Sequence, residues 1–216
     1  MSFSSKELPL LASLENTIES WPEMRPSEKT AAILANMTSA ARPAARLIHE
    51  LHRKGKPSSA DIIASLAIML SDKADGVIAK TFDGQTEFGK EFDPLMDKFD
   101  FFIWEFAQYQ RGNLTIHHLI TRLGRDIAVT LVRSHVKGAT DGAVDISAGW
   151  QGKTTTAIRG ASLVSTDTTL ERFAPRTLHQ HLATAAIVTS GAINIKNLLN
   201  EKTNYLNSLP VEQRED

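Results

Sequence analysis

The stretch SDKADGVIAKTFDGQTEFGKEFDPLMDKFDFF, residues 71–102, decides what this chain can fold into and what it can do. Asp72 and Asp75 are three residues apart, and Asp93 and Asp97 are four residues apart. Either spacing places two carboxylates on one face of an α-helix. Apolar residues are interspersed among these acids, and acids scattered over a solvated surface would need no fixed spacing. The spacing therefore points to a purpose for the carboxylates.

Small residues accompany both pairs of carboxylates. Gly76 and Ala79 share the face of the first pair, and Gly89 shares the face of the second. Residues of this size let a ligand or a neighbouring backbone approach closely. If the two helices pack antiparallel across a turn at Asp83-Gly84, four carboxylates converge, repel one another and shift one another's pKa values. A divalent cation would neutralise them, and a ligand set made only of oxygen suits Mg²⁺, Mn²⁺ or Ca²⁺ rather than zinc.

A structural interpretation competes with the functional one for each pair alone. Two acids at helical spacing usually mark a solvated helix face, and Asp93 before Pro94 also fits an N-cap followed by proline at the first helical position. The combined pattern is D-x2-D-G-x2-A-K-x8-G-x3-D-x3-D, with seven fixed residues besides the lysine. At average residue usage, a chance match in a chain of this length has a probability on the order of one in a million.

Helical patterns dominate the rest of the chain, and strand signals are scarce. Ser58 to Asp61 predicts an N-cap, and Pro and Gly residues mark most of the connections. We expect an all-α six-helix bundle with an N-terminal extension (residues 1–28), a helical domain (residues 29–206) and a polar tail (residues 207–216). The predicted helices cover residues 30–54, 62–82, 86–109, 114–136, 153–166 and 177–205.

Composition excludes several classes of protein. The chain has 24 basic and 25 acidic residues, so no overall field attracts nucleic acid. It has no cysteine, which excludes disulfides and thiolate metal sites. No run of 18 apolar residues is present, so hydropathy alone predicts a soluble, cytoplasmic protein.

The acidic stretch resembles the signature of the CDP-alcohol phosphotransferase (CDP-alcohol phosphatidyltransferase) family, D-x2-D-G-x2-A-R-x8 or 9-G-x3-D-x3-D. Lys80 stands where the family has arginine. Lysine keeps the positive charge but cannot make the bidentate hydrogen bonds of a guanidinium to a phosphate. The residues that fall in place are Asp72, Asp75, Gly76, Ala79, Gly89, Asp93 and Asp97.

Flanking segments resemble the phosphatidylglycerophosphate synthase branch, in the order in which that branch has them. AILANMTSAARPAARLI (residues 32–48) is similar to P-N-x2-T-x2-R, which places Asn36 and Arg42. FGKEFDPLMDK is similar to F-G-x3-D-P-x2-D-K. RDIAVTLVRSH is similar to R-E-x5-L-R, which places Arg125 and Arg133. GKTTTAIR (residues 152–159) is similar to G-K-x-K-T-x2-Q, with departures at Thr155 and Arg159.

The resemblance implies a six-helix membrane enzyme of phospholipid biosynthesis that transfers a phospho-alcohol from a CDP-alcohol to an acceptor hydroxyl and releases CMP. Two Mg²⁺ or Mn²⁺ ions would be held by Asp72, Asp75, Asp93 and Asp97, and Asp97 would be the catalytic base. The CDP-alcohol would contact Asn36, Asp72, Gly76, Ala79, Lys80 and Gly89. An acceptor such as glycerol 3-phosphate would contact Arg42, Arg125, Arg133 and Lys153. The departures leave the acceptor open, and a homodimer is compatible with the resemblance.

The family's membrane location, of the bacterial inner-membrane type, conflicts with the polarity of the predicted helices. Ionisable groups facing lipid are costly, and these helices carry so many polar residues that we do not expect all of them to be hidden inside. The residues concerned are Arg42, Arg46, His49, Glu105, Gln108, Arg122, Arg125 and Arg133.

Three interpretations remain open at this point. The chain is a membrane enzyme with marginal helices, a water-soluble relative that acts on soluble substrates, or a soluble, inactive module that binds divalent metal and a cytidine nucleotide. We favour an active enzyme because all four aspartates are present. The four histidines in two close pairs are expected to be structural or surface residues: His117, His118, His179 and His181.

Overall fold

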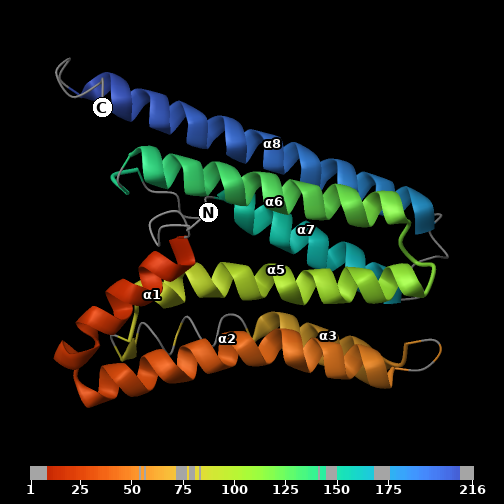
Figure 1. The fold of residues 1–216 in the computed structure, drawn as a ribbon. Coiled ribbons are helices and arrows are strands. Elements are labelled where there is room, and N and C mark those ends of the chain that lie inside the picture. Colours follow the sequence, from red (N-terminus) through yellow and green to blue (C-terminus); the bar gives the residue numbers. More distant parts are fainter. Residues whose placement is uncertain are drawn as a thin grey trace, which may run out of the picture. The chain divides into compact units, whose positions relative to one another are not determined.

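The computed structural model describes residues 9–53, 55, 57–71, 77, 81–82, 84–140, 142–144, 150–167 and 176–209. Within these ranges the chain is helical and contains no strand, so the all-α prediction is confirmed (Figure 1). The chain divides into two compact units, Met1–Ala107 and Gln108–Asp216. The helices are α1 (Pro9–Ser20), the 3₁₀ helix η2 (Trp21–Glu23), α2 (Pro26–His52), α3 (Ser59–Leu70), α5 (Glu87–Gln110), α6 (Ile116–Ala139), α7 (Trp150–Asp167) and α8 (Arg176–Ser208).

Five of the six predicted helices correspond to α2, α5, α6, α7 and α8 within a few residues at most ends. The predicted helix over residues 62–82 begins in α3, but much of its second half lies outside the described residues. Helix α1 was not predicted and lies in the segment expected to be an extension. The expected count of six helices therefore remains a prediction.

In the first unit, α2 and α3 form a pair joined by a capped connection. The Ser58 hydroxyl accepts a hydrogen bond from the Asp61 N–H at 3.2 Å, and the Ser58 N–H donates to the Asp61 carboxylate at 2.7 Å. This reciprocal capping box confirms the predicted start of the helix. At the start of α2, the Arg25 N–H donates to Glu28 at 2.7 Å, and this hydrogen bond lowers the pKa of the exposed Glu28 carboxyl.

Two threonine hydroxyls satisfy the N-terminus of α5, the helix that carries Asp93 and Asp97. Thr86 Oγ1 accepts from the Gly89 N–H at 3.0 Å, and Thr17 Oγ1, from α1, accepts from the Phe88 N–H at 3.0 Å. The first N–H groups of a helix have no partner within it, so both contacts stabilise its start. Pro94 lies inside α5, so the interpretation of Asp93 as an N-cap is wrong.

Gly84, in the predicted turn, explains how the chain reaches α5 so close to α2. A Cβ at this position would lie 2.6 Å from the Ala31 Cβ and 2.7 Å from the Ala32 N. Contacts this short with the backbone of a neighbouring helix leave room only for glycine. Asp83, the other half of the predicted turn, lies outside the described residues.

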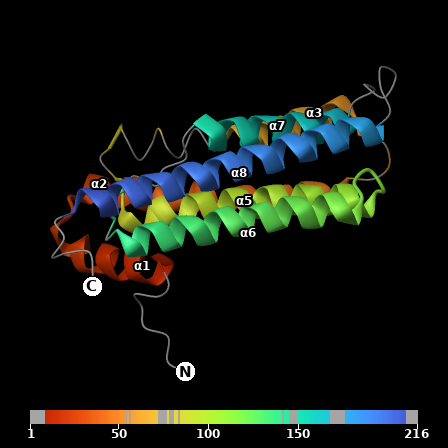
Figure 2. The same cartoon turned by 90° about the horizontal axis from the view of Figure 1, so that it is seen from above.

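The second unit is built from α6, α7 and α8, with α8 packed along both of the others (Figure 2). His118 contacts His181, and His135 contacts Lys202, so α6 and α8 run in the same direction. Helix α7 runs the opposite way, because Thr155 near its start contacts Ser190 and Ser162 near its end contacts Gln180.

The helices carry their polar side chains inside and many large apolar side chains outside. Arg42, Arg46, Glu105, Gln108 and Arg122 are each at most 3% exposed. Five of the eight polar residues named in the sequence analysis are therefore inside, whereas His49, Arg125 and Arg133 are only partly buried. The exposed apolar side chains of α2 and α6 include Ile33, Leu34, Met37, Leu47, Ile48, Leu51, Ile116, Ile120, Leu123, Ile127 and Leu131.

This polarity is the reverse of that of a helix at the surface of a water-soluble protein, which turns its apolar side inward. The polar residues do not have to face the surroundings, because they pair with one another. Among the described residues, one helical stretch, Leu178–Ser208, is long and apolar enough to cross a membrane by length and composition.

We predict that Thr17→Ala and Thr86→Ala each lower the free energy of unfolding by about 1 kcal/mol, because each leaves an N–H of α5 without its partner. Thermal unfolding followed by circular dichroism measures the change. Thr30→Ala is the matched control, since the exposed Thr30 hydroxyl only donates to the Pro26 carbonyl of its own helix. An equal loss in the control would contradict a specific role of these hydroxyls at α5.

Candidate active site

Asp93 and Asp97 lie on the face of α5 that meets α2, as their spacing predicts. The Ser39 hydroxyl donates to Asp93 Oδ1 at 2.5 Å, and the Arg42 guanidinium forms an ion pair with Asp97. Ser39 is fully buried, and the Arg42 side chain is 2% exposed. The Asp97 side chain is 38% exposed, so its carboxylate can be reached from outside while Arg42 holds it from within.

A third contact continues this row one helical turn further along both helices. Arg46 donates to the two carboxylate oxygens of Asp100 at 3.0 and 3.3 Å and to the Ser65 carbonyl at 3.2 Å. Its guanidinium also lies 4.1 Å from the ring centroid of Trp104, a distance typical of cation–π contact. The pairs 39–93, 42–97 and 46–100 together fix the register of α2 against α5.

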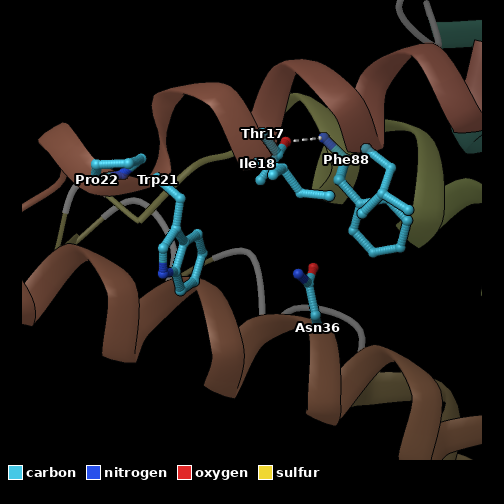
Figure 3. Close-up of a pocket in the computed structure, with 7 residues that line it drawn as sticks. Thr17, Ile18, Trp21, Pro22, Asn36 and Phe88 are labelled. Atoms are coloured by element: carbon cyan, nitrogen blue, oxygen red, sulfur yellow. Dashed lines mark hydrogen bonds between the residues drawn. The ribbon is translucent and has the colours of Figure 1, made fainter.

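Asn36 lies one turn before Ser39 on α2, next to Gly89. A Cβ at Gly89 would lie 3.2 Å from Asn36 Oδ1, so the glycine lets the amide approach the backbone of α5. Asn36 also borders a cavity of about 440 Å³, shown in Figure 3, whose other walls come from α1, η2 and α5. Its lining is otherwise largely apolar and includes Leu14, Ile18, Trp21 and Phe88.

Five of the predicted site residues lie outside the described residues, and nothing is concluded about their positions: Asp72, Asp75, Gly76, Ala79 and Lys80. Within the described ranges no group of three or more His, Cys, Asp or Glu residues is placed to hold a metal ion. Asp93 and Asp97 supply hard oxygen ligands of the kind that Mg²⁺ and Mn²⁺ prefer. These two residues fit a divalent cation in chemistry and supply only part of its coordination.

In the second unit, Arg125 is held by a network of polar side chains. Its guanidinium donates to Asp126 Oδ1 at 3.0 Å and to Thr155 Oγ1 at 3.1 Å. The other oxygen of Asp126 accepts from Arg159 at 2.5 Å. The Arg125 side chain lies directly on Gly191, where a Cβ would come within 2.7 Å of the Arg125 Cγ. Thr155 and Arg159, the two departures from the branch pattern that residues 152–159 resemble, both belong to this network.

Arg133 and Lys153, the other predicted cations of this unit, have fewer contacts. Arg133 is partly buried and is repelled by the like charge of Arg125. In the part of the chain that the structure describes, its Nε is buried without a hydrogen-bond partner. Lys153 is exposed near the start of α7. Arg42 belongs to the first unit, so the four predicted acceptor residues are divided between the two units.

His118 and His181 form a hydrogen-bonded pair with 3.1 Å between Nε2 of the first and Nδ1 of the second. His118 Nδ1 also contacts the Thr115 hydroxyl at 2.8 Å. The buried His118 thus uses one ring nitrogen in a contact between α6 and α8 and the other in a contact with the N-cap residue of α6, which is consistent with the expected structural role. His117 is exposed.

The sequence analysis missed Ser39 and Asp126, which orient other site residues, and it gave Asp100 no role. One signal could have identified the contacts of α2. Residues 39, 42 and 46 are spaced by three and four, as α5 spaces residues 93, 97 and 100 by four and three. Two parallel helices with matching polar stripes can pair residue by residue.

A comparison with models of known protein families finds a match over most of the chain. The model described as CDP-alcohol phosphatidyltransferase covers residues 32–191, which is well over half of the chain. The matched range includes the acidic stretch, most of α2, and the network around Arg125. No curated protein matches the chain significantly.

Proposed function

This chain belongs to the CDP-alcohol phosphatidyltransferase family, and on that basis we propose that it is an active transferase that depends on Mg²⁺ or Mn²⁺. Members of this family transfer a phospho-alcohol from a CDP-alcohol to an acceptor and generally require a divalent metal. The observation that carries the proposal is the pair Asp93 and Asp97 on one face of α5, held by Ser39 and Arg42.

The proposed reaction assigns a proton transfer to Asp97. The acceptor hydroxyl oxygen forms a bond to the donor's phosphorus as the bond to the CMP oxygen breaks, and CMP leaves with that electron pair. The Asp97 carboxylate takes the hydroxyl proton, and its partial exposure supports this role. Asp72, Asp75, Asp93 and Asp97 would hold the metal. When bound, the metal neutralises charge on the diphosphate as the bond breaks.

The donor site is proposed around Asn36 and Gly89, together with Asp72, Gly76, Ala79 and Lys80 of the acidic signature. The close approach of the Asn36 amide to Gly89 supports it, because this amide is positioned beside the helix that carries both described aspartates. An amide can both donate and accept hydrogen bonds, as contact with a polar nucleotide requires.

The acceptor is proposed to carry a phosphate, as in the phosphatidylglycerophosphate synthase branch, for which glycerol 3-phosphate is the example. Arg125 and Arg133 support this, since two neighbouring guanidiniums repel unless an anion lies between or beside them. Arg42 and Lys153 remain proposed contacts of the same acceptor. Asp126 is shared by Arg125 and Arg159, so an acceptor phosphate would add further negative charge beside Arg125 and Arg133.

A membrane location is proposed from the reversed polarity of the helices. Members of the family are typically integral membrane proteins. In lipid, ionisable side chains turn to the protein interior and pair with one another, and Arg42, Arg46 and Arg122 are arranged in this way. The large apolar side chains exposed on α2 and α6 would then contact lipid. A homodimer remains a prediction.

We predict that release of CMP from a CDP-alcohol requires Mg²⁺ or Mn²⁺. Asp97→Asn should reduce turnover by roughly 10²- to 10⁴-fold, because the amide cannot accept the proton. Asp93→Asn should instead weaken metal and CDP-alcohol binding together. Measurements of CMP release and calorimetric donor binding on the same variants separate these effects. Full activity of Asp97→Asn would rule out its role as the base. Metal and nucleotide binding without turnover in the wild-type protein would indicate the binding module instead.

We predict that Arg133→Gln raises the KM for a phosphorylated acceptor by roughly tenfold or more, which is the effect of losing a hydrogen bond to a charged group. Gly191→Ala should act in the same direction, because its methyl group displaces the Arg125 side chain. The KM for the donor should not change. Lys196→Gln, on the exposed side of α8, is the control. An unchanged acceptor KM in both variants would contradict this acceptor site.

We predict that the untagged protein fractionates with membranes and resists extraction by high salt and alkaline carbonate, because its exposed apolar side chains lie in lipid. Detergent should release it in folded form, as judged by circular dichroism. Recovery of the protein in the soluble fraction, folded and without detergent, would contradict the membrane location and favour a water-soluble relative.

A further inference from the structure

Two arginine–aspartate pairs with buried guanidinium groups join α2 to α5 one turn apart, and they differ in how the carboxylate is enclosed. Asp100, the partner of Arg46, has a side chain that is 3% exposed, whereas the Asp97 side chain is 38% exposed. The two arginines are almost equally buried, at 0% and 2% of their side-chain surface. The difference between the pairs therefore lies on the side of the carboxylate.

The Arg46 pair is closed on all sides. The guanidinium donates two bonds to Asp100 and one to the Ser65 carbonyl and lies over the ring of Trp104, and its Nη1 is buried without a hydrogen-bond partner among the described residues. Trp104 is fully buried. A solute cannot reach Asp100 without opening the helix pair, so this contact is structural.

The Arg42 pair is open on one side. A buried guanidinium requires an anion beside it, since an uncompensated charge in the interior is costly. Asp97 provides that anion from within and keeps part of its carboxylate accessible from outside. The proposed function makes this carboxylate a metal ligand and the acceptor of the hydroxyl proton. The Arg42 guanidinium and the divalent metal ion would therefore both bind the Asp97 carboxylate.

We propose that Arg42 is the resident counter-ion of the metal site and that a divalent cation competes with it for Asp97. This inference rests on the proposed function, because it takes Asp97 as a metal ligand. In the metal-free protein the guanidinium holds the Asp97 side chain against α2 and offsets the repulsion of the neighbouring Asp93. Binding of the metal weakens this ion pair and frees the guanidinium to pair with a phosphate.

If Arg42 competes with the metal, its removal changes the metal affinity in the opposite direction to removal of a residue that helps to bind the metal. Removal of Arg42 takes away a competing positive charge, so the metal should bind more tightly while the metal-free protein becomes less stable. A residue that only orients Asp97 would lose metal affinity when removed. The sign of the change in affinity therefore distinguishes a competing cation from an orienting one.

The experiment is a titration of the full-length protein with Mn²⁺, without substrates, in which free Mn²⁺ is followed by electron paramagnetic resonance. Arg42→Gln should bind Mn²⁺ roughly three- to tenfold more tightly than the wild type, the effect of removing a partly screened like charge. Arg46→Gln is the matched control, since it breaks the other buried pair between the same helices. It should lower the melting temperature of the metal-free protein, as Arg42→Gln does, but leave the Mn²⁺ affinity within twofold.

Arg42→Lys keeps the charge, so it protects the test if Arg42→Gln does not fold. A lysine cannot make the two parallel hydrogen bonds by which a guanidinium binds a carboxylate. The Mn²⁺ affinity of the Arg42→Lys variant should therefore lie above that of the wild type and below that of Arg42→Gln. Unchanged or weaker Mn²⁺ binding in the folded Arg42 variants would overturn the proposal, as would an equal gain in Arg46→Gln. If the wild-type protein binds no Mn²⁺, it is the metal site of the proposed function that fails.

Discussion

The burial of guanidinium groups between α2 and α5 is the constraint on which the first unit depends. A buried guanidinium is costly without compensation, and α5 supplies Asp97 and Asp100, one turn apart, opposite Arg42 and Arg46, which are one turn apart on α2. Long polar side chains thus set the register of the two helices, and Ser39 extends the row to Asp93. The same row that aligns the helices orients the carboxylates proposed for catalysis. Packing and chemistry therefore depend on one set of contacts.

The second unit also buries guanidinium groups, which a different network of polar side chains holds. Arg122 is fully buried and donates to Gln180 and Thr184, and Asp126 is shared by Arg125 and Arg159. This network accommodates the two departures from the branch pattern that residues 152–159 resemble. Thr155 accepts from Arg125, where a lysine would repel it, and Arg159 contributes a positive charge that Asp126 neutralises. The partners of these two residues, Arg125 and Asp126, contact each other, so both departures belong to one network.

A large part of the fold and of the candidate site could be predicted from the sequence. The helical periodicity predicted α2, α5, α6, α7 and α8, and Ser58 predicted the start of α3. The spacing of four between Asp93 and Asp97 predicted that both face one neighbour. Helix α1 was missed because its buried face carries Ser13 and Thr17 while Leu11 and Ile18 are exposed, the reverse of the pattern that predicts an amphipathic helix in water.

By itself, the sequence determined the helical class, the family and the set of residues that could carry chemistry, because these depend on local spacing and residue type. Only the tertiary structure decided which charges meet. Sequence reasoning assigned Arg42 to an acceptor, and the structure pairs it with Asp97, fifty-five positions away. It also decided that Arg46, Glu105 and Arg122 are inside. Charge pairing and burial are properties of the assembled helices, since a side chain's environment is made by residues distant along the chain, and no local pattern specifies them.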